Sequence, residues 1–173
     1  MRKIILGFAI LMVIFLTSFF VIGTVRKVQK HRLIEDKISR FPPFSFMTLS
    51  NRLFNSSEIK DGPILVVHFH PECEHCQYEI SEIFKSNIPK SFTKVFLISS
   101  AHLDSIRNFL KQFNYTDYKS VIPLVDTSFS FQEIFGKGSI PSSYVYSRKL
   151  KLIKAFHGEV KTENILNLLQ QGE

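Results

Sequence analysis

The sequence predicts an α/β domain with a mixed central sheet and helices on both faces, preceded by one transmembrane helix. Three observations support this prediction. Residues 4–25 contain no charged side chain. From about residue 60, short apolar runs alternate with amphipathic segments, as strands and helices alternate in α/β folds. Near the C-terminus a hairpin pattern and a last amphipathic segment replace this alternation, so the sheet is expected to be mixed.

The uncharged segment 4–25 is rich in Ile, Leu, Phe and Val. About 20 apolar helical residues are enough to cross the hydrocarbon core of a bilayer. The apolar part of a cleaved signal peptide is shorter, about 7–15 residues, and no small-x-small cleavage pattern precedes Arg26. Residues 1–25 are therefore predicted to form an uncleaved signal anchor that contacts membrane lipid.

The basic charge of the chain is concentrated near the predicted anchor. The formal net charge is +7, of which residues 1–40 carry +6 and residues 41–173 carry +1. A nucleic-acid-binding domain needs a basic face of its own, so this class of function is excluded. Residues 26–40 are predicted to be a charged juxtamembrane linker, and Pro42-Pro43 ends any helix there. The folded domain is predicted to span residues 41–173.

The elements of this domain follow from apolar periodicity and turn residues. Segments 44–49 and 52–54 predict an N-terminal hairpin, and Ser56-Ser57 predicts a helical turn. Segment 64–70 is apolar enough for a strand buried on both faces, and 74–87 has the spacing of an amphipathic helix. By the same criteria the later strands are expected at 94–99, 121–125, 142–147 and 150–156, and the later helices at 103–113, 128–135 and 162–170.

Cys73 and Cys76 are the only cysteines of the chain, and they stand where the strand 64–70 gives way to the helix 74–87. A C-x-x-C at such a junction is typical of a thioredoxin-like redox site. The helix N-terminus favours the thiolate of Cys73, which would attack a disulfide, and Cys76 would resolve the mixed disulfide. The only redox group expected is their own disulfide, with no further cofactor.

Three neighbours of the cysteines act on this pair in opposite directions. A protonated His75 would stabilise the Cys73 thiolate and make the disulfide more oxidising, whereas Glu72 and Glu74 would oppose this by like-charge repulsion. The sequence therefore leaves open whether the pair serves as a reductant or as an oxidant.

A metal site is the competing interpretation of the same run. In it, a thioredoxin-like module would bind copper or zinc, or a protein partner, without turnover. The strand places His68 and His70 on one face, directed away from part of the helix, and no second Cys/His cluster exists. Haem attachment requires His directly after the second Cys, where Gln77 stands. No metal site is therefore predicted. The donors that this alternative would use are His68, His70, Cys73, His75 and Cys76.

Three stretches resemble one known group of proteins. These are residues 43–69, residues 73–79, and the run Ile140-Pro141-Ser142-Ser143 with the hairpin that follows it. Together they resemble the membrane-anchored, extracytoplasmic thioredoxin-like proteins of bacteria, the TlpA/ResA type, over roughly residues 42–170. The resemblance implies a thioredoxin-like fold with an insert near residues 93–125.

The resemblance also implies roles for three residues. Pro141 matches the cis-proline of the family, which would leave the backbone of Ile140 free to pair with an extended substrate. Glu79 matches an acid that tunes the thiols and shuttles a proton. Two positions depart from the pattern: Glu72 replaces the usual Trp, and Val67 stands where cytosolic thioredoxins have a buried acid.

The implied function is thiol–disulfide exchange with dithiol or disulfide proteins, namely exported proteins or apocytochromes. An electron donor or acceptor in the membrane or outside it is implied as well. The charges that flank residues 4–25 slightly favour a cytoplasmic domain. Disulfides, however, persist in oxidising compartments, and we expect a single-pass protein of the bacterial cytoplasmic membrane with its catalytic domain on the periplasmic or extracytoplasmic side.

Overall fold

A computed structural model of the chain describes residues 2–136 and 139–171, with side chains at only part of the positions in the first helix. The chain divides into two units, Met1–Asp36 and Lys37–Glu173. Helix α1 (Arg2–Ile38) is continuous through the predicted span and the predicted linker.

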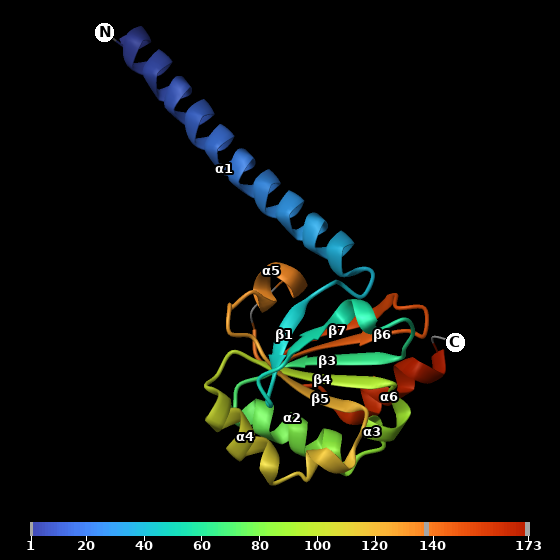
Figure 1. The fold of residues 1–173 in the computed structure, drawn as a ribbon. Helices are drawn as coiled ribbons and strands as arrows, with labels where there is room; N and C mark the ends of the chain where they lie inside the picture. The colour runs from blue at the N-terminus through green and yellow to red at the C-terminus, as the bar shows by residue number, and fades with distance from the viewer. Residues whose placement is uncertain (1, 137–138, 172–173) are drawn as a thin grey trace. The chain divides into compact units, whose positions relative to one another are not determined.

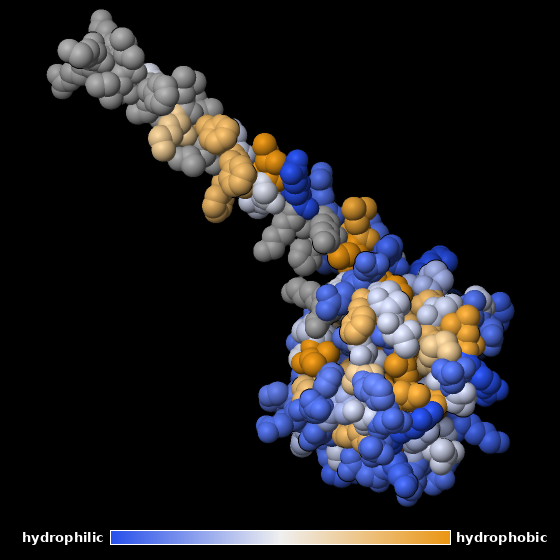
Figure 2. All heavy atoms as spheres, turned by 60° about the vertical axis from the view of Figure 1, so that its left-hand side comes forward, coloured by the Kyte–Doolittle hydropathy of each residue, from blue (hydrophilic) through white to orange (hydrophobic). Residues whose placement is uncertain are grey.

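The predicted span 4–25 falls partly on residues whose side chains lie outside the described ones. Most of the described large apolar side chains of α1 are exposed, Ile38 at its end being buried, and orange spheres mark apolar residues along this helix in Figure 2. Among the described residues, no helix has the length and apolar character needed to cross a membrane.

The second unit is built on a seven-stranded sheet with the strand order β2-β1-β5-β4-β3-β6-β7. The three central strands β5, β4 and β3 are parallel, and every other pairing is antiparallel. The predicted mixed sheet is thereby confirmed. The strands are β1 (Ser45–Thr48), β2 (Leu53–Asn55), β3 (Ile64–His68), β4 (Lys94–Ser99), β5 (Val121–Val125), β6 (Ser142–Tyr146) and β7 (Leu152–His157).

Helices cover both faces of this sheet, also as predicted (Figure 1). Along β3 the side chains alternate between two apolar clusters, with Leu65 and Val67 in one and Ile64 and Val66 in the other. The first cluster includes residues of α2, α3, α4 and α6, and the second includes residues of α5. The helices are α2 (Glu74–Lys85), α3 (Ile88–Ser91), α4 (Leu103–Lys111), α5 (Phe131–Phe135) and α6 (Thr162–Gln171).

Several element boundaries differ from the prediction for local reasons. Helix α2 ends at Lys85, and a short unpredicted helix, α3, follows it. Pro89 lies in the first turn of α3, where a missing N–H removes no helical hydrogen bond. Helix α5 begins at Phe131 rather than at 128, because the buried carboxylate of Asp126 accepts hydrogen bonds from the backbone N–H groups of Ser130 and Phe131.

Two short 3-10 helices complete the fold of the residues that the structure describes. The first, Ser56–Glu58, occupies the predicted helical turn, with Asn55 as its cap. The second, Tyr115–Asp117, was not predicted. It lies between α4 and β5, within the predicted insert, which contains β4, α4 and β5.

The residues that lead into the domain are joined to the edge of the sheet. Ile38 is buried in the second apolar cluster. Arg40 forms an isolated antiparallel bridge with Lys151. On either side of this bridge, the Leu152 N–H donates to the Ser39 carbonyl (2.9 Å) and the Phe41 N–H donates to the Leu150 carbonyl (2.8 Å). The end of the predicted linker is therefore part of the folded unit.

Candidate active site

The cysteine pair stands where β3 ends and α2 begins. Cys73 is the N-cap of α2, with an extended backbone (φ −87°, ψ 116°), and its sulfur accepts a hydrogen bond from the Cys76 N–H at 3.3 Å. Two further bonds hold the preceding loop, from the Cys73 N–H to the His70 carbonyl (3.1 Å) and from the Gln77 side chain to the Pro71 carbonyl (2.7 Å). The chain thus places the Cys73 sulfur at the positive end of the helix.

Both cysteines are free thiols, and the Cys76 thiol donates to the Cys73 sulfur across 2.7 Å. Their exposure differs, because Cys73 is half-buried whereas Cys76 is fully buried. Burial, followed by the hydrogen bond to Cys73, raises the pKa of Cys76 to about 12. Cys73 is therefore the sulfur that an external disulfide can reach, and Cys76 stays protonated until a base takes its proton.

Glu79 supplies a carboxyl group one helical turn after Cys76, and it is completely buried. Ser143 Oγ donates to its Oε1 at 2.5 Å, and the Val160 N–H donates to its Oε2 at 3.2 Å. Burial raises the pKa of Glu79 to about 7, the two hydrogen bonds counteract this rise, and the charge of Glu159 adds to it. Glu79 can therefore exchange a proton near neutral pH.

On the exposed side of the motif, His75 Nδ1 lies 2.7 Å from Oε2 of Glu159, in the loop between β7 and α6. The two side chains are 76% and 36% exposed, so solvent screens this ion pair. The other two predicted tuning residues, Glu72 and Glu74, are exposed. The Glu72 N–H donates to His70 Nδ1 at 3.2 Å.

The predicted substrate-contact residues precede β6, which lies beside β3. The Ile140–Pro141 peptide bond is cis. The Pro141 carbonyl accepts from the Gly158 N–H (2.9 Å), which ties this turn to the end of β7. Ile140 is 39% exposed, and none of the backbone hydrogen bonds among the described residues involves its N–H or C=O group.

His68, a donor in the alternative metal interpretation, lies on the face of the sheet opposite α2. Its buried ring stacks on Phe131 of α5 with centroids 4.0 Å apart, within the second apolar cluster. Burial lowers the pKa of His68 to about 4, so its imidazole is neutral at physiological pH. Within residues 2–136 and 139–171, no three His, Cys, Asp or Glu side chains are grouped as metal ligands.

Three residues of the site were not found by sequence reasoning. Ser143, Glu159 and the Val160 N–H reach α2 from 64 to 84 positions away. Ser143 is placed by the pairing of β6 with β3, in which it lies opposite Val67. Its only sequence signal is its position two residues after Pro141.

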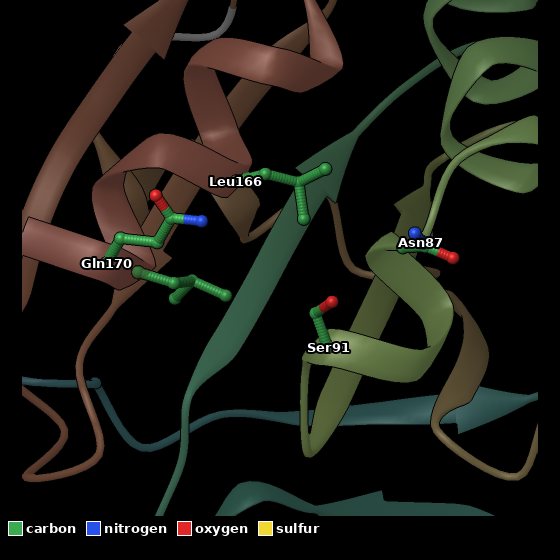
Figure 3. A pocket seen from close by; sticks show the side chains of 5 residues that line it. Asn87, Ser91, Leu166 and Gln170 are labelled. Atoms are coloured by element: carbon green, nitrogen blue, oxygen red, sulfur yellow. The ribbon is translucent and has the colours of Figure 1, made fainter.

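A pocket between α3 and α6 contains no residue of the cysteine site. It is lined by Asn87, Ser91, Leu166, Leu169 and Gln170. Figure 3 shows Leu166 and Gln170 on α6 opposite Ser91 on α3.

Comparison with known proteins defines the fold. No protein-family profile matches the sequence, and no curated protein matches it. Solved structures do match, among them the exposed lipoprotein thioredoxin Etrx1 of Streptococcus pneumoniae. It is 21% identical with a TM-score of 0.59, and the match covers 75% of this chain and 98% of Etrx1.

Two further matches have the same character. A secreted disulfide oxidoreductase of Mycobacterium tuberculosis is 14% identical with a TM-score of 0.62, over 78% of this chain and 97% of its own. StoA of Bacillus subtilis is 13% identical with a TM-score of 0.57, and the match covers 75% of this chain and 98% of StoA. The fold is therefore thioredoxin-like, which confirms that part of the prediction.

Proposed function

We propose that this chain is a thiol–disulfide oxidoreductase that works through Cys73 and Cys76. The observation that carries the proposal is the asymmetry of the two thiols. A half-buried sulfur at a helix N-terminus touches a fully buried one, 2.7 Å away, above a buried carboxyl group. The solved structures of similar fold include proteins described as a thioredoxin and a disulfide oxidoreductase, which supports the same class of reaction.

In the first step the Cys73 thiolate attacks one sulfur of a substrate disulfide. The substrate S–S bond breaks, a Cys73–substrate disulfide forms, and the other substrate sulfur leaves as a thiolate that takes a proton from water. The helix N-terminus and the Cys76 S–H both stabilise the attacking thiolate. The free backbone groups of Ile140 would pair with the extended substrate next to this sulfur.

In the second step the Cys76 sulfur attacks Cys73, the Cys73–Cys76 bond forms, the Cys73–substrate bond breaks, and the second substrate sulfur leaves as a thiolate that takes a proton from water. The Cys76 thiol must lose its proton first, and its pKa of about 12 makes this unfavourable without a base. Glu79, with a pKa of about 7, is the buried group placed to accept the proton. The cycle transfers two electrons and two protons to the substrate and leaves Cys73–Cys76 as a disulfide. An electron donor must then reduce this disulfide.

The substrates that we propose are disulfides of exported proteins or apocytochromes. The proposed location is the extracytoplasmic side of a bacterial cytoplasmic membrane, with residues 4–25 as the anchor. The uncharged composition of residues 4–25 supports the anchor, and the need of a disulfide for an oxidising compartment supports the location. Two solved structures of similar fold are described as an exposed lipoprotein and a secreted protein.

The first test is turnover. Pre-reduced protein is expected to reduce the interchain disulfides of insulin catalytically when a chemical reductant recycles it, which the precipitation of the B chain reports. The equilibrium of the pair with glutathione then gives the direction of electron flow. A reduction potential of about −270 mV for the cysteine pair would indicate a reductant, and one of about −120 mV would indicate an oxidant. A rate no higher than that of the recycling reductant alone would contradict the proposal.

The second test is membrane topology. A C-terminal fusion to a phosphatase that is active only after export is expected to be active in bacterial cells and to sediment with membranes. A fusion that lacks residues 1–25 is the matched control, and its phosphatase is expected to be inactive. Activity of only a cytoplasmic reporter fused at the same position would contradict the proposed location.

A further inference from the structure

Two neighbouring residues, Glu159 and Val160, contact the cysteine helix at different points. The carboxylate of Glu159 lies 2.7 Å from Nδ1 of His75, in the exposed first turn of α2. The N–H of the next residue, Val160, donates to the buried carboxyl group of Glu79 at 3.2 Å. The loop that enters α6 thus binds both a residue between the two cysteines and the proposed proton acceptor.

We propose that Glu159 is a positioning residue that lowers the reduction potential of the Cys73–Cys76 pair by holding the His75 imidazole and by placing a negative charge beside it. The inference rests on the proposed function, because it concerns the redox equilibrium of that same pair.

The sign of the effect follows from charge. A thiolate can form on Cys73 only in the reduced protein, because neither sulfur of the disulfide can ionise. Positive charge beside Cys73 therefore stabilises the reduced form and raises the reduction potential. With Glu159 present, the His75–Glu159 pair has a net charge of zero or below. With glutamine at 159, the net charge of the pair is zero or above, whatever the protonation of His75.

Geometry adds to this effect of charge. The Nδ1 atom is the ring nitrogen that Glu159 engages, so the hydrogen bond directs this edge of the imidazole toward the β7–α6 loop. Without Glu159 the exposed ring is free to turn toward the helix N-terminus and donate to the Cys73 sulfur. This second contribution has the same sign as the first.

The other charged or titratable groups around these side chains are few. Among the described contacts, Glu79 is faced by Ser143 from β6, by the Val160 N–H, and by the charge of Glu159, while Cys76 lies on its own helix. Along α2 no lysine or arginine stands between His75 and Lys85. Two acidic residues, Glu72 and Glu74, precede His75. Glu159 is the group that acts on both His75 and Glu79.

The experiment measures the equilibrium of full-length Glu159→Gln protein with glutathione. One disulfide and two glutathione molecules exchange to give the dithiol and one glutathione disulfide, so electrons and protons balance. The equilibrium constant for reduction of the pair is expected to rise about two- to fivefold over wild type, the range for a solvent-screened ion pair. This increase is expected to shrink in high salt, which screens exposed charges.

Two further variants sharpen the test. Glu163→Gln makes the same charge change at an exposed position in the first turn of α6, and it is expected to leave the constant unchanged. His75→Gln leaves Glu159 as an unpaired negative charge, and it is expected to lower the constant. The two members of the pair should therefore shift the equilibrium in opposite directions, which a loss of folding would not do.

Glu79 gives an independent readout, since the charge of Glu159 raises its pKa. Its carboxyl ¹³C signal in reduced Glu159→Gln protein is expected to titrate at a lower pH than in wild type. If the equilibrium constant for reduction of the cysteine pair by glutathione is equal or lower in Glu159→Gln than in wild type, the inference is overturned. These equilibria need no substrate turnover. A failed insulin assay would therefore contradict the proposed function, whereas the effect of Glu159 on the equilibrium constant would still be measurable.

Discussion

Replacing Cys73 with serine is expected to abolish insulin reduction, whereas Cys76→Ser is expected to stop the reaction after its first step. Cys73 is the half-buried sulfur at the start of α2, and Cys76 is buried beneath it. The Cys76→Ser protein can therefore still attack a substrate disulfide but cannot release the product. In cells it should accumulate mixed disulfides that migrate as higher-mass species without reductant and collapse when reductant is added.

The two variants are matched controls for each other, because each keeps one thiol and the chain has no other cysteine. Mass spectrometry of the trapped species should place the bond at Cys73. If Cys73→Ser traps substrates as well as Cys76→Ser does, the assignment of the attacking sulfur is wrong. If neither variant traps a partner, a role in thiol–disulfide exchange is contradicted.

Replacing Glu79 with glutamine is expected to slow turnover on the order of 100-fold at pH 8 and to remove its rise with pH around neutrality. General base catalysis contributes on this scale. Glu79 can accept the Cys76 proton only when ionised, so wild-type turnover should increase as the pH rises through about 7. In the variant no carboxylate forms at this position, and the profile should be flat there. Single-turnover release of a fluorescent thiol measures this second step.

The same substitution should raise stability, which distinguishes a role in proton transfer from a structural one. In the folded protein the pKa of Glu79 is about 7, above the value of about 4.3 expected for an unfolded chain. The contribution of this group to stability is therefore fully present below about pH 4.3 and is lost as the pH rises through 7. At pH 8 the reduced Glu79→Gln protein should be more stable than wild type by on the order of 3 kcal/mol, and at pH 4 by much less.

Glu82→Gln is the matched control for both readouts. Glu82 lies on the same helix, is partly exposed, and pairs with Lys85 at 3.0 Å rather than with the site. Its replacement should leave the pH profile and the pH dependence of stability as in wild type. A Glu79→Gln protein with an unchanged pH profile would contradict the assignment of Glu79 as the proton acceptor.

The elements that sequence patterns predicted best are those with one strong local signal. Strands β4 and β5 have the predicted bounds, because each is a continuous apolar run with polar or turn residues on both sides. The N-terminus of α2 is equally well defined, since the cysteines and the preceding apolar run mark it. A boundary set by a side-chain cap was missed, as at α5, whose first N–H groups donate to the side chain of Asp126 four and five residues earlier.

The site has a part that the sequence predicts, made of residues close together in the chain, and a part that it does not predict, made of residues from distant elements. Cys73, Cys76, His75 and Glu79 lie within seven positions of one another, and helical spacing alone brings them together. The groups that set the environment of Glu79 come from β6 and from the loop before α6. Their proximity depends on sheet register, which no local pattern contains.

The register also places Val67, where a buried acid was expected only in cytosolic thioredoxins, beside a residue of the site. In this fold Val67 is completely buried, and Ser143 on the neighbouring strand lies opposite it and donates to Glu79. The buried carboxyl group of the site therefore comes from the helix and not from the strand. Its hydroxyl partner, Ser143, stands two residues after Pro141, so the turn that we propose to contact substrate is connected to the acid through one short stretch of β6.

The bridge between Arg40 and Lys151 has a mechanical consequence. A tensile load that enters through α1 meets the two main-chain hydrogen bonds beside this bridge and the buried Ile38 before it reaches the seven-stranded sheet. The outermost strand β7 carries this junction, and β7 ends next to the loop that holds Glu159. Traction on the proposed anchor would thus be borne by the strand that leads into that loop, while α2, which carries Cys76, follows β3 in the middle of the sheet.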